Sequence, residues 1–260
     1  MKKFLALLLV AALTCACLTG CSSSGKTIDD IKKAGKLVIA TSPDFPPFEE
    51  LQEGGAVEGI EIDVLNLVCK ELGVELVIEQ MDFDSVLPGV QAGKYDLGVS
   101  GISVTEDRQK NALFTDPYCL AAQAIVVVDG SPITCKADLE GKSVSVQTGT
   151  TAEIYCQSQN YSVNGFTANS DAELAVVNGK VDAWVIDDLT AAEMVAAYNA
   201  EHDDKLVILG EAMTTEPYAF ATKLGNKDMI KGINDIINKL VADGTVASIF
   251  AKFDAPYTKP

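Results

Sequence analysis

The chain has 260 residues, of which 48% are hydrophobic and 22% are charged. These proportions are typical of a globular protein and exclude an intrinsically disordered or collagen-like chain. The 20 lysine and arginine residues face 37 acidic ones, a formal net charge of −17, so we expect no nucleic-acid partner. The single histidine, His202, lies in a polar stretch, which argues against a histidine-based hydrolase and against a histidine zinc site.

The N-terminus has the pattern of an export signal. Two lysines follow Met1, residues 4–17 are almost all apolar, and Leu18-Thr19-Gly20-Cys21 precedes a Ser/Gly stretch. The apolar run is too short to span a bilayer comfortably and has the length of a signal-peptide core. The segment around Cys21 resembles the bacterial lipobox. We therefore expect residues 1–20 to be removed, Cys21 to be lipidated and residues 21–26 to form a flexible tether. A plain secretory signal with an incidental cysteine is the alternative.

Four further cysteines would remain in the mature chain: Cys69, Cys119, Cys135 and Cys156. Their spacing is not that of metal ligands and no C-x-x-C motif occurs, so we expect neither a metal nor a redox site. Cys69 lies on the apolar face of an expected helix, which favours a buried free thiol. Cys135 and Cys156 bracket one expected strand and could form a disulfide.

Strands and helices alternate along the rest of the chain. In the first series, Thr27 is a suitable N-cap for a short helix that ends at Gly35. A proline-rich loop follows the first strand. The expected strands are 36–41, 75–80 and 96–99, and the expected helices are 61–72 and 87–91.

A second series of similar length follows. Its expected strands are 123–128, 143–147, 181–186, 206–209 and 218–222. One expected helix begins near Thr151, two others cover 171–177 and 189–198, and two more lie within 227–253. This alternation predicts an α/β protein with largely parallel sheets, and the two series suggest two lobes. Ligands of such sheets bind beyond the carboxyl ends of the strands.

Four strand-end loops and one strand-end carboxylate carry suitable chemistry. Phe45 and Phe83 supply aromatic side chains in two of the loops. In the third, small residues lead to a helix start with a guanidinium at Arg108; in the fourth, residues 147–151 lead to another helix start. Asp187 adds a carboxylate at the end of a strand. Guanidinium and free amides suit an α-carboxylate, and a carboxylate suits an α-ammonium. Together these features predict a site for a free amino acid.

Several motifs resemble the extracytoplasmic solute-binding proteins of amino-acid ABC transporters. They are Gly59-Ile60-Glu61-Ile62-Asp63, Leu87-Pro88, Gly93-Lys94-Tyr95-Asp96, residues 100–108, Phe114-Thr115-Asp116-Pro117-Tyr118, Asp138-Leu139-Glu140-Gly141-Lys142, residues 147–151, residues 182–188 and Asp243-Gly244-Thr245. The resemblance is colinear from about Lys36 to Phe253. It implies a periplasmic-binding-protein type II fold, in which two α/β lobes are joined by two crossover strands around a ligand cleft. By that analogy lobe 1 is 26–121 plus 216–260, and lobe 2 is 122–215.

The resemblance also implies roles for individual residues. Arg108 would bind the ligand carboxylate in a forked contact, helped by Ser103 and the backbone of Gly101. Asp187 would bind the ammonium group, and Phe45 and Phe83 would form aromatic walls. From lobe 2 the closing residues would be Gly149, Thr150 and Thr151.

One position departs from the family pattern. Ser42 stands where histidine-, arginine- and glutamine-binding members often have an aspartate that holds the polar end of the ligand side chain. Asp44 or Glu49 could take its place. Gln147 at the rim of lobe 2 favours hydrogen bonding to a polar side chain, so we expect a polar, uncharged amino acid.

The function implied by this resemblance is capture of a free L-amino acid by hinge closure and its delivery to an ABC permease. We expect a monomer without cofactor or metal, held by its lipid on the outer face of the cell membrane. Two alternatives stay open at this point. One is an enzyme on the same fold, similar to cyclohexadienyl or prephenate dehydratases, and the other is a ligand-sensing lipoprotein that signals through a membrane receptor.

Overall fold

The structure is a computed structural model that describes residues 25–203, 205–210 and 212–260. The expected signal peptide and Cys21 lie outside the described residues. Within the described ranges, no helix is both long and apolar enough to cross a membrane.

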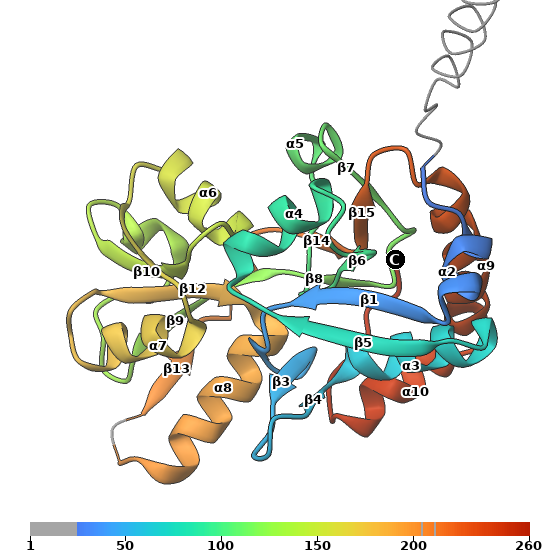
Figure 1. Ribbon diagram of the computed structural model, residues 1–260. Helices are drawn as coiled ribbons and strands as arrows, with labels where there is room; N and C mark the ends of the chain where they lie inside the picture. The colour runs from blue at the N-terminus through green and yellow to red at the C-terminus, as the bar shows by residue number, and fades with distance from the viewer. Residues whose placement is uncertain (1–24, 204, 211) are drawn as a thin grey trace, which may run out of the picture.

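The first of two five-stranded sheets has the strand order β5-β1-β6-β15-β7 (Figure 1). The pairs β1–β5 and β1–β6 are parallel, whereas β15 is antiparallel to both of its neighbours. A strand from the C-terminal part of the chain therefore lies inside a sheet built mainly from the N-terminal part. The strands are β1 (Lys36–Thr41), β5 (Glu75–Gln80), β6 (Leu97–Gly98), β7 (Ala112–Phe114) and β15 (Ala221–Lys223).

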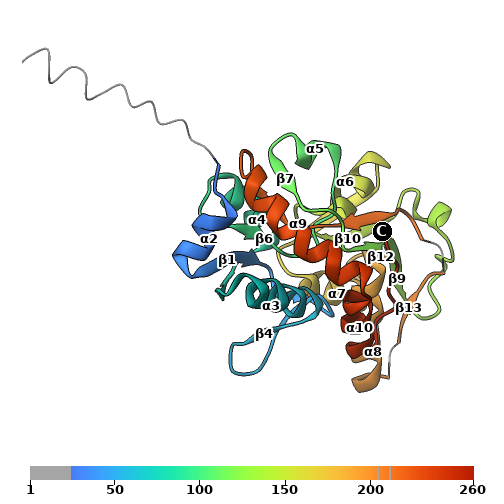
Figure 2. The ribbon, with the colours of Figure 1, turned by 90° about the vertical axis from the view of Figure 1, so that its right-hand side faces the viewer.

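Helices from both ends of the chain pack around this sheet, with α10 lying against α3 and α9, and Figure 2 shows the C-terminal pair crossing beside the N-terminal helices. They are α2 (Ile28–Ala34), α3 (Ile60–Leu72), α4 (Phe83–Gln91), α9 (Lys227–Ala242) and α10 (Thr245–Lys252). Local signals explain the bounds of α2. The Thr27 side chain accepts a hydrogen bond from the Asp30 N–H, and Gly35 ends the helix at φ 70°, a left-handed conformation that glycine adopts without strain.

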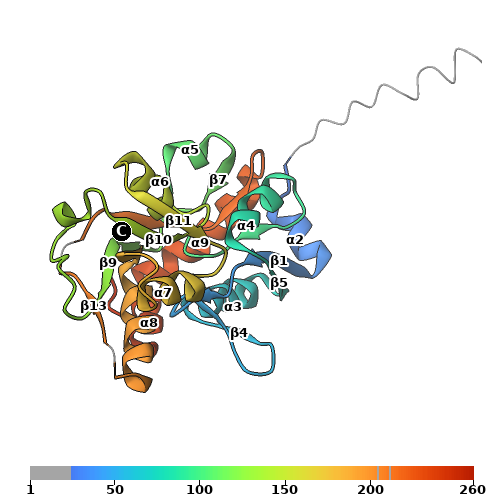
Figure 3. The same cartoon turned by 90° about the vertical axis from the view of Figure 1, so that its left-hand side faces the viewer.

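The second sheet has the order β11-β10-β12-β9-β13, and Figure 3 views it with its helices. Here β10 is parallel to β11 and β12, while β9 is antiparallel to β12 and β13. The strands are β9 (Gln123–Val128), β10 (Ser143–Gln147), β11 (Ser162–Phe166), β12 (Ala183–Asp187) and β13 (Leu206–Ile208). The helices are α6 (Thr151–Ser158), α7 (Asn169–Val177) and α8 (Asp188–Glu201), with the short 3-10 helix η2 (Lys136–Leu139).

Two short antiparallel strands connect the two halves: β8 (Cys119–Ala121) pairs with β14 (Glu216–Tyr218). The chain therefore leaves the first lobe along β8 and returns along β14. A further small sheet is formed by β2 (Asp44–Phe45), β3 (Glu49–Leu51) and β4 (Val57–Glu58), and α5 (Glu106–Gln109) is a single helical turn.

Each five-stranded sheet is largely parallel, as expected: only β15 in the first sheet and β9 in the second run against their neighbours. One expectation about the strands is wrong. The expected strand 218–222 is divided between β14 and β15, since the chain changes sheets at residues 219–220. Helix α4 begins at Phe83, four residues earlier than expected, and so carries this aromatic side chain at its first turn.

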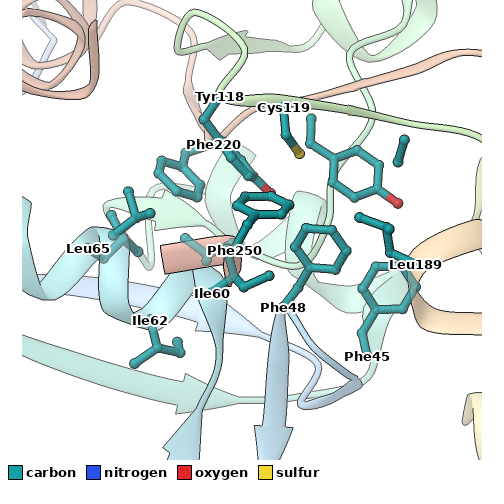
Figure 4. Packing of buried hydrophobic residues seen from close by; sticks show 14 of the residues in the cluster. Phe45, Phe48, Ile60, Ile62, Leu65, Tyr118, Cys119, Leu189, Phe220 and Phe250 are labelled. Carbon is teal, nitrogen blue, oxygen red and sulfur yellow. The ribbon is translucent and has the colours of Figure 1, made fainter. Parts of the chain in front are cut away.

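An aromatic cluster lies where the first lobe meets the crossover strands (Figure 4). Phe48 is fully buried, and its ring centroid lies 5.6 Å from that of Phe45, 5.1 Å from that of Tyr218 and 6.0 Å from that of Phe250. Burial of one such side chain contributes about 1.5–3 kcal/mol. The cluster fixes Phe45, an expected site residue, to the core.

The disulfide that Cys135 and Cys156 could have formed is not present: both are free thiols, as are Cys69 and Cys119. Cys156 is buried in the core of the second sheet, where burial raises the pKa of its thiol to about 12. Cys135 precedes η2, and its sulfur lies 3.5 Å from Oδ2 of Asp138. The buried free thiol expected at Cys69 is confirmed.

Candidate functional site

A small cavity lies between the lobes. Both lobes line it. Nine of the twelve residues expected at the site do so: Phe45, Phe83, Gly101, Ser103, Arg108, Gln147, Thr150, Thr151 and Asp187.

Arg108 is the only arginine of the sequence and lies in α5. Its Nη1 donates to the carbonyl oxygen of Ser103 (2.9 Å), and its Nη2 donates across the cleft to that of Gly149 (3.1 Å). The guanidinium also lies over the Phe83 ring, 5.7 Å from its centroid. Burial lowers the pKa of Arg108, although the charges of Glu216 and Asp187 raise it. The guanidinium remains charged at any physiological pH, and Arg108 lines the cavity.

Asp187 ends β12 and is only 7% exposed. Its carboxylate accepts short hydrogen bonds from the Tyr218 hydroxyl and from Nε2 of Gln123. Burial raises the pKa of Asp187 well above its usual range, and the nearby charges of Glu216 and Asp188 raise it further. The positive charge of Arg108 opposes this rise. A second cation beside Asp187 would favour the ionised carboxylate in the same way.

A chain of hydroxyl and amide contacts joins these two charged residues. The Ser103 and Thr151 hydroxyls lie 3.5 Å apart across the cleft, and Nε2 of Gln123 donates to Thr151 Oγ1 (3.3 Å). Thr151 begins α6, whose N-cap is Thr150. We call Ser103, Arg108, Thr151 and Asp187 the charged end of the cavity. It brings a cation, a carboxylate and a helix N-terminus together, which suits a zwitterion.

The aromatic side chains flank this cavity from the first lobe. Phe45 is 8% exposed and packs closely on Gly101, where an added Cβ would lie 2.4 Å from the ring. Gly101 has φ 52°, so both the close approach and the left-handed backbone require glycine.

Two buried carboxylates lie behind this loop. The Gly101 N–H donates to Oε2 of Glu61 (3.1 Å), and the Ser100 hydroxyl donates to Oε1 of Glu49 (3.0 Å). Both glutamates are fully buried, and burial raises the pKa of each. The Gly101 N–H, expected to meet the ligand carboxylate, is thus directed at Glu61. Gly101 nevertheless lines the cavity.

Three expected residues do not line the cavity wall: Ser42, Asp44 and Gly149. Ser42 donates to Asp44 (3.0 Å), and Asp44 contacts the second lobe. Gly149, at φ 84°, packs against Asp84, so it is a closing contact between lobes. The sequence analysis missed Ser100, Ala152, Asn169, Val185 and Ile186, which line the cavity. Asn169 is the polar residue at the start of α7, and a strand–helix boundary there would have indicated it.

Residues 37–255 match the family described as bacterial extracellular solute-binding proteins, family 3. The chain belongs to this family. Among curated relatives, the L-cystine-binding protein TcyJ of Escherichia coli (strain K12) is 29% identical over 239 residues, covering 89% of this chain and 88% of TcyJ. Holo ArgBP from T. maritima superposes with a TM-score of 0.77 at 36% identity, covering 85% of this chain and 99% of that one. An ancestral arginine-binding protein bound to glutamine gives a TM-score of 0.80 at 36% identity, with 85% and 99% covered.

Membership of family 3 makes the protein an extracytoplasmic solute-binding protein of an amino-acid ABC transporter and not an enzyme. The expected two-lobe fold is confirmed, and so is the expected function, binding of a polar amino acid for import. The dehydratase alternative is therefore set aside.

Proposed function

We propose that the cavity binds a single polar L-amino acid, with its α-carboxylate at Arg108 and its α-ammonium at Asp187. The observation that carries this assignment is the charged end itself. A half-buried guanidinium and a buried carboxylate line one small cavity and influence each other's pKa. A zwitterion inserted there offers each group an opposite charge, which compensates for the desolvation of both.

The remaining contacts follow from the same placement. Ser103, Thr151 and the first N–H groups of α6 would complete the carboxylate site, while Phe45 and Phe83 would cover the side chain. The residues come from both lobes, so the ligand stabilises the closed form through contacts that the open form lacks. Hinge closure of this kind is a general mode of periplasmic binding proteins. We place the lobes at residues 26–121 plus 216–260 and at 122–215.

The names of similar proteins support a polar ligand. TcyJ is named for L-cystine, ArgBP from T. maritima is known in an arginine-bound form, and the ancestral protein is bound to glutamine. Each of these ligands is polar, and each carries the α-ammonium and α-carboxylate that the charged end would bind.

A thermal-shift screen tests this assignment. Protein of residues 22–260, which includes every described residue, is unfolded, freed of ligand, refolded and screened against the common L-amino acids. For a micromolar ligand at 1 mM, linkage predicts about 4 kcal/mol of stabilisation and a rise in Tm on the order of 10 °C. Absence of a shift with every amino acid, from protein that refolds, would refute the proposal.

We further propose that Cys21 carries a lipid that anchors the protein on the outer face of the cell membrane, next to its permease. The lipobox-like sequence supports this assignment. Phase partition of the expressed full chain in a cloud-point detergent tests it. The wild-type protein and a Cys17→Ala control should enter the detergent phase, and Cys21→Ala should remain in the aqueous phase. Equal partition of all three would refute the anchor.

A further inference from the structure

A second polar group lines the same cavity in addition to the charged end. It consists of the side-chain amides of Gln147, at the end of β10, and Asn169, at the start of α7. Both residues are nearly fully buried, at 3% and 1% exposure. If the charged end holds the α-carboxylate and α-ammonium, these amides are left to meet the ligand side chain.

Asp44 of the first lobe holds both amides across the cleft. Nε2 of Gln147 donates to its carboxylate (3.3 Å) and to the Thr167 carbonyl oxygen (3.1 Å). Nδ2 of Asn169 donates to the Asp44 carbonyl oxygen (3.4 Å) and to Oε1 of Gln147 (3.2 Å). The Asn169 backbone N–H also donates to the Asp44 carboxylate (2.7 Å). Ser42 fixes the carboxylate from its own lobe.

These contacts determine which way each amide points. A carboxylate and a backbone carbonyl only accept hydrogen bonds, so the Gln147 atom that faces them is the nitrogen. The same reasoning places the Asn169 nitrogen toward the Asp44 carbonyl oxygen. Each NH₂ group has two hydrogens, and each hydrogen already has an acceptor. What remains for a ligand is the acceptor capacity of Gln147 Oε1 and Asn169 Oδ1.

We propose that this site selects amino acids whose side chain ends in a hydrogen-bond donor, and that Asp44 determines the selection by fixing the two amides. The inference rests on the proposed ligand orientation. A guanidinium, amide or imidazole group would donate to the remaining lone pairs of these two oxygens. A side-chain carboxylate would face the same oxygens and the nearby negative charge of Asp44 and could donate to neither oxygen. Asp44 is a positioning residue, since it acts through the amides.

Titration calorimetry with two nearly isosteric ligand pairs tests the proposal: L-glutamine against L-glutamate, and L-asparagine against L-aspartate. L-Arginine and L-histidine extend the donor set. A site whose buried oxygens accept hydrogen bonds from the ligand binds an analogue without a donor group many-fold more weakly. We expect the tightest donor ligand to bind at least about 100-fold tighter than the tightest acidic one.

The Asp44→Asn variant tests the role of Asp44. Its amide carries no negative charge and can turn its own NH₂ toward Gln147, so that only the Thr167 carbonyl oxygen still holds the Gln147 nitrogen. We expect the donor-to-acid affinity ratio to fall by at least about tenfold, since one hydrogen-bond preference is removed. Asp29→Asn is the matched control, because Asp29 is an exposed carboxylate of the first lobe, in the first turn of α2, and no described contact joins it to either amide. Its ratio should equal that of the wild type.

The outcomes separate the two proposals. Binding of acidic ligands within tenfold of the donors would overturn the selection and leave amino-acid binding intact. An unchanged ratio in Asp44→Asn, with ligand-free Tm unchanged, would overturn the role of Asp44. If no amino acid binds the refolded wild type, the proposed function fails and the selection fails with it.

Discussion

Replacement of Arg108 by lysine separates charge from geometry at the charged end. The arginine is held by two carbonyl oxygens, at 2.9 and 3.1 Å, and lies over the Phe83 ring. Its planar fork can therefore meet a ligand carboxylate in a fixed direction. Lysine keeps the positive charge but presents it as a point on a flexible stem, and cannot form two parallel hydrogen bonds.

The expected loss follows from counting hydrogen bonds. One bond to a charged partner is worth about 1.5–3 kcal/mol, so Arg108→Lys should weaken binding by about 10- to 150-fold. Arg108→Ala loses both bonds and the charge, about 3–6 kcal/mol in all, and should weaken binding by about 10²- to 10⁴-fold. The ligand-free Tm should change little, because α5 is a single turn that contributes no buried residue.

Isothermal titration with the amino acid that gives the largest thermal shift measures both variants. Lys110→Ala is the control, because it removes the other cation at this turn, whose ion pair with Asp107 is exposed. Its affinity should equal that of the wild type. If Arg108→Lys binds within about threefold of the wild type, the fork is not formed and another group holds the ligand carboxylate.

Three further substitutions test the surroundings of the cavity. Burial and the negative charge of the buried Glu61 raise the pKa of Glu49, so the neutral Glu49 carboxyl is the form that stabilises the fold. This stabilisation is complete below the ordinary pKa of 4.5 and is lost as pH rises through the folded-state pKa. Glu49→Gln should thus flatten the fall in Tm as pH rises above 5, whereas the exposed Glu50→Gln should follow the wild type. Gly101→Ala should destabilise the fold by about 1–3 kcal/mol, because the added methyl group overpacks against Phe45. Scanning calorimetry should show the lower Tm, and titration should show weaker ligand binding. Asp187→Asn should weaken binding at least about tenfold without lowering the ligand-free Tm, since it removes a buried charge; unchanged affinity would contradict its role at the ammonium.

The elements with strong local signals were predictable from the sequence. Strands β1, β5, β9 and β10 have the expected bounds, because each is a run of strand-forming residues closed by glycine, proline or polar residues. Short strands such as β7 and β8 carry too few residues to show a period, and only their partners in the folded chain define them.

The site was predictable where it depended on strand ends that the sequence reveals. Arg108, Asp187 and Gln147 follow expected strands and were found. Asn169 follows β11, a strand with a glycine, an asparagine and mostly exposed side chains, which gives no clear hydrophobic alternation. Because that strand was missed, the loop after it was never considered. The role of Asp44 needed the closed arrangement of both lobes, which no local pattern contains.

The position of β15 has a consequence for how the chain is made. This strand lies between β6 and β7 in the first sheet, yet it is synthesised after every strand of the second sheet. A nascent chain that has emerged up to residue 215 already holds β9 to β13 and can complete that half. The half that begins at the N-terminus cannot form its complete sheet until the last 40 or so residues emerge, because they include β15, which pairs with both β6 and β7. The half that starts first is thus finished last, and a chain cut short near its C-terminus would lose the lobe that carries Arg108 while it kept the one that carries Asp187.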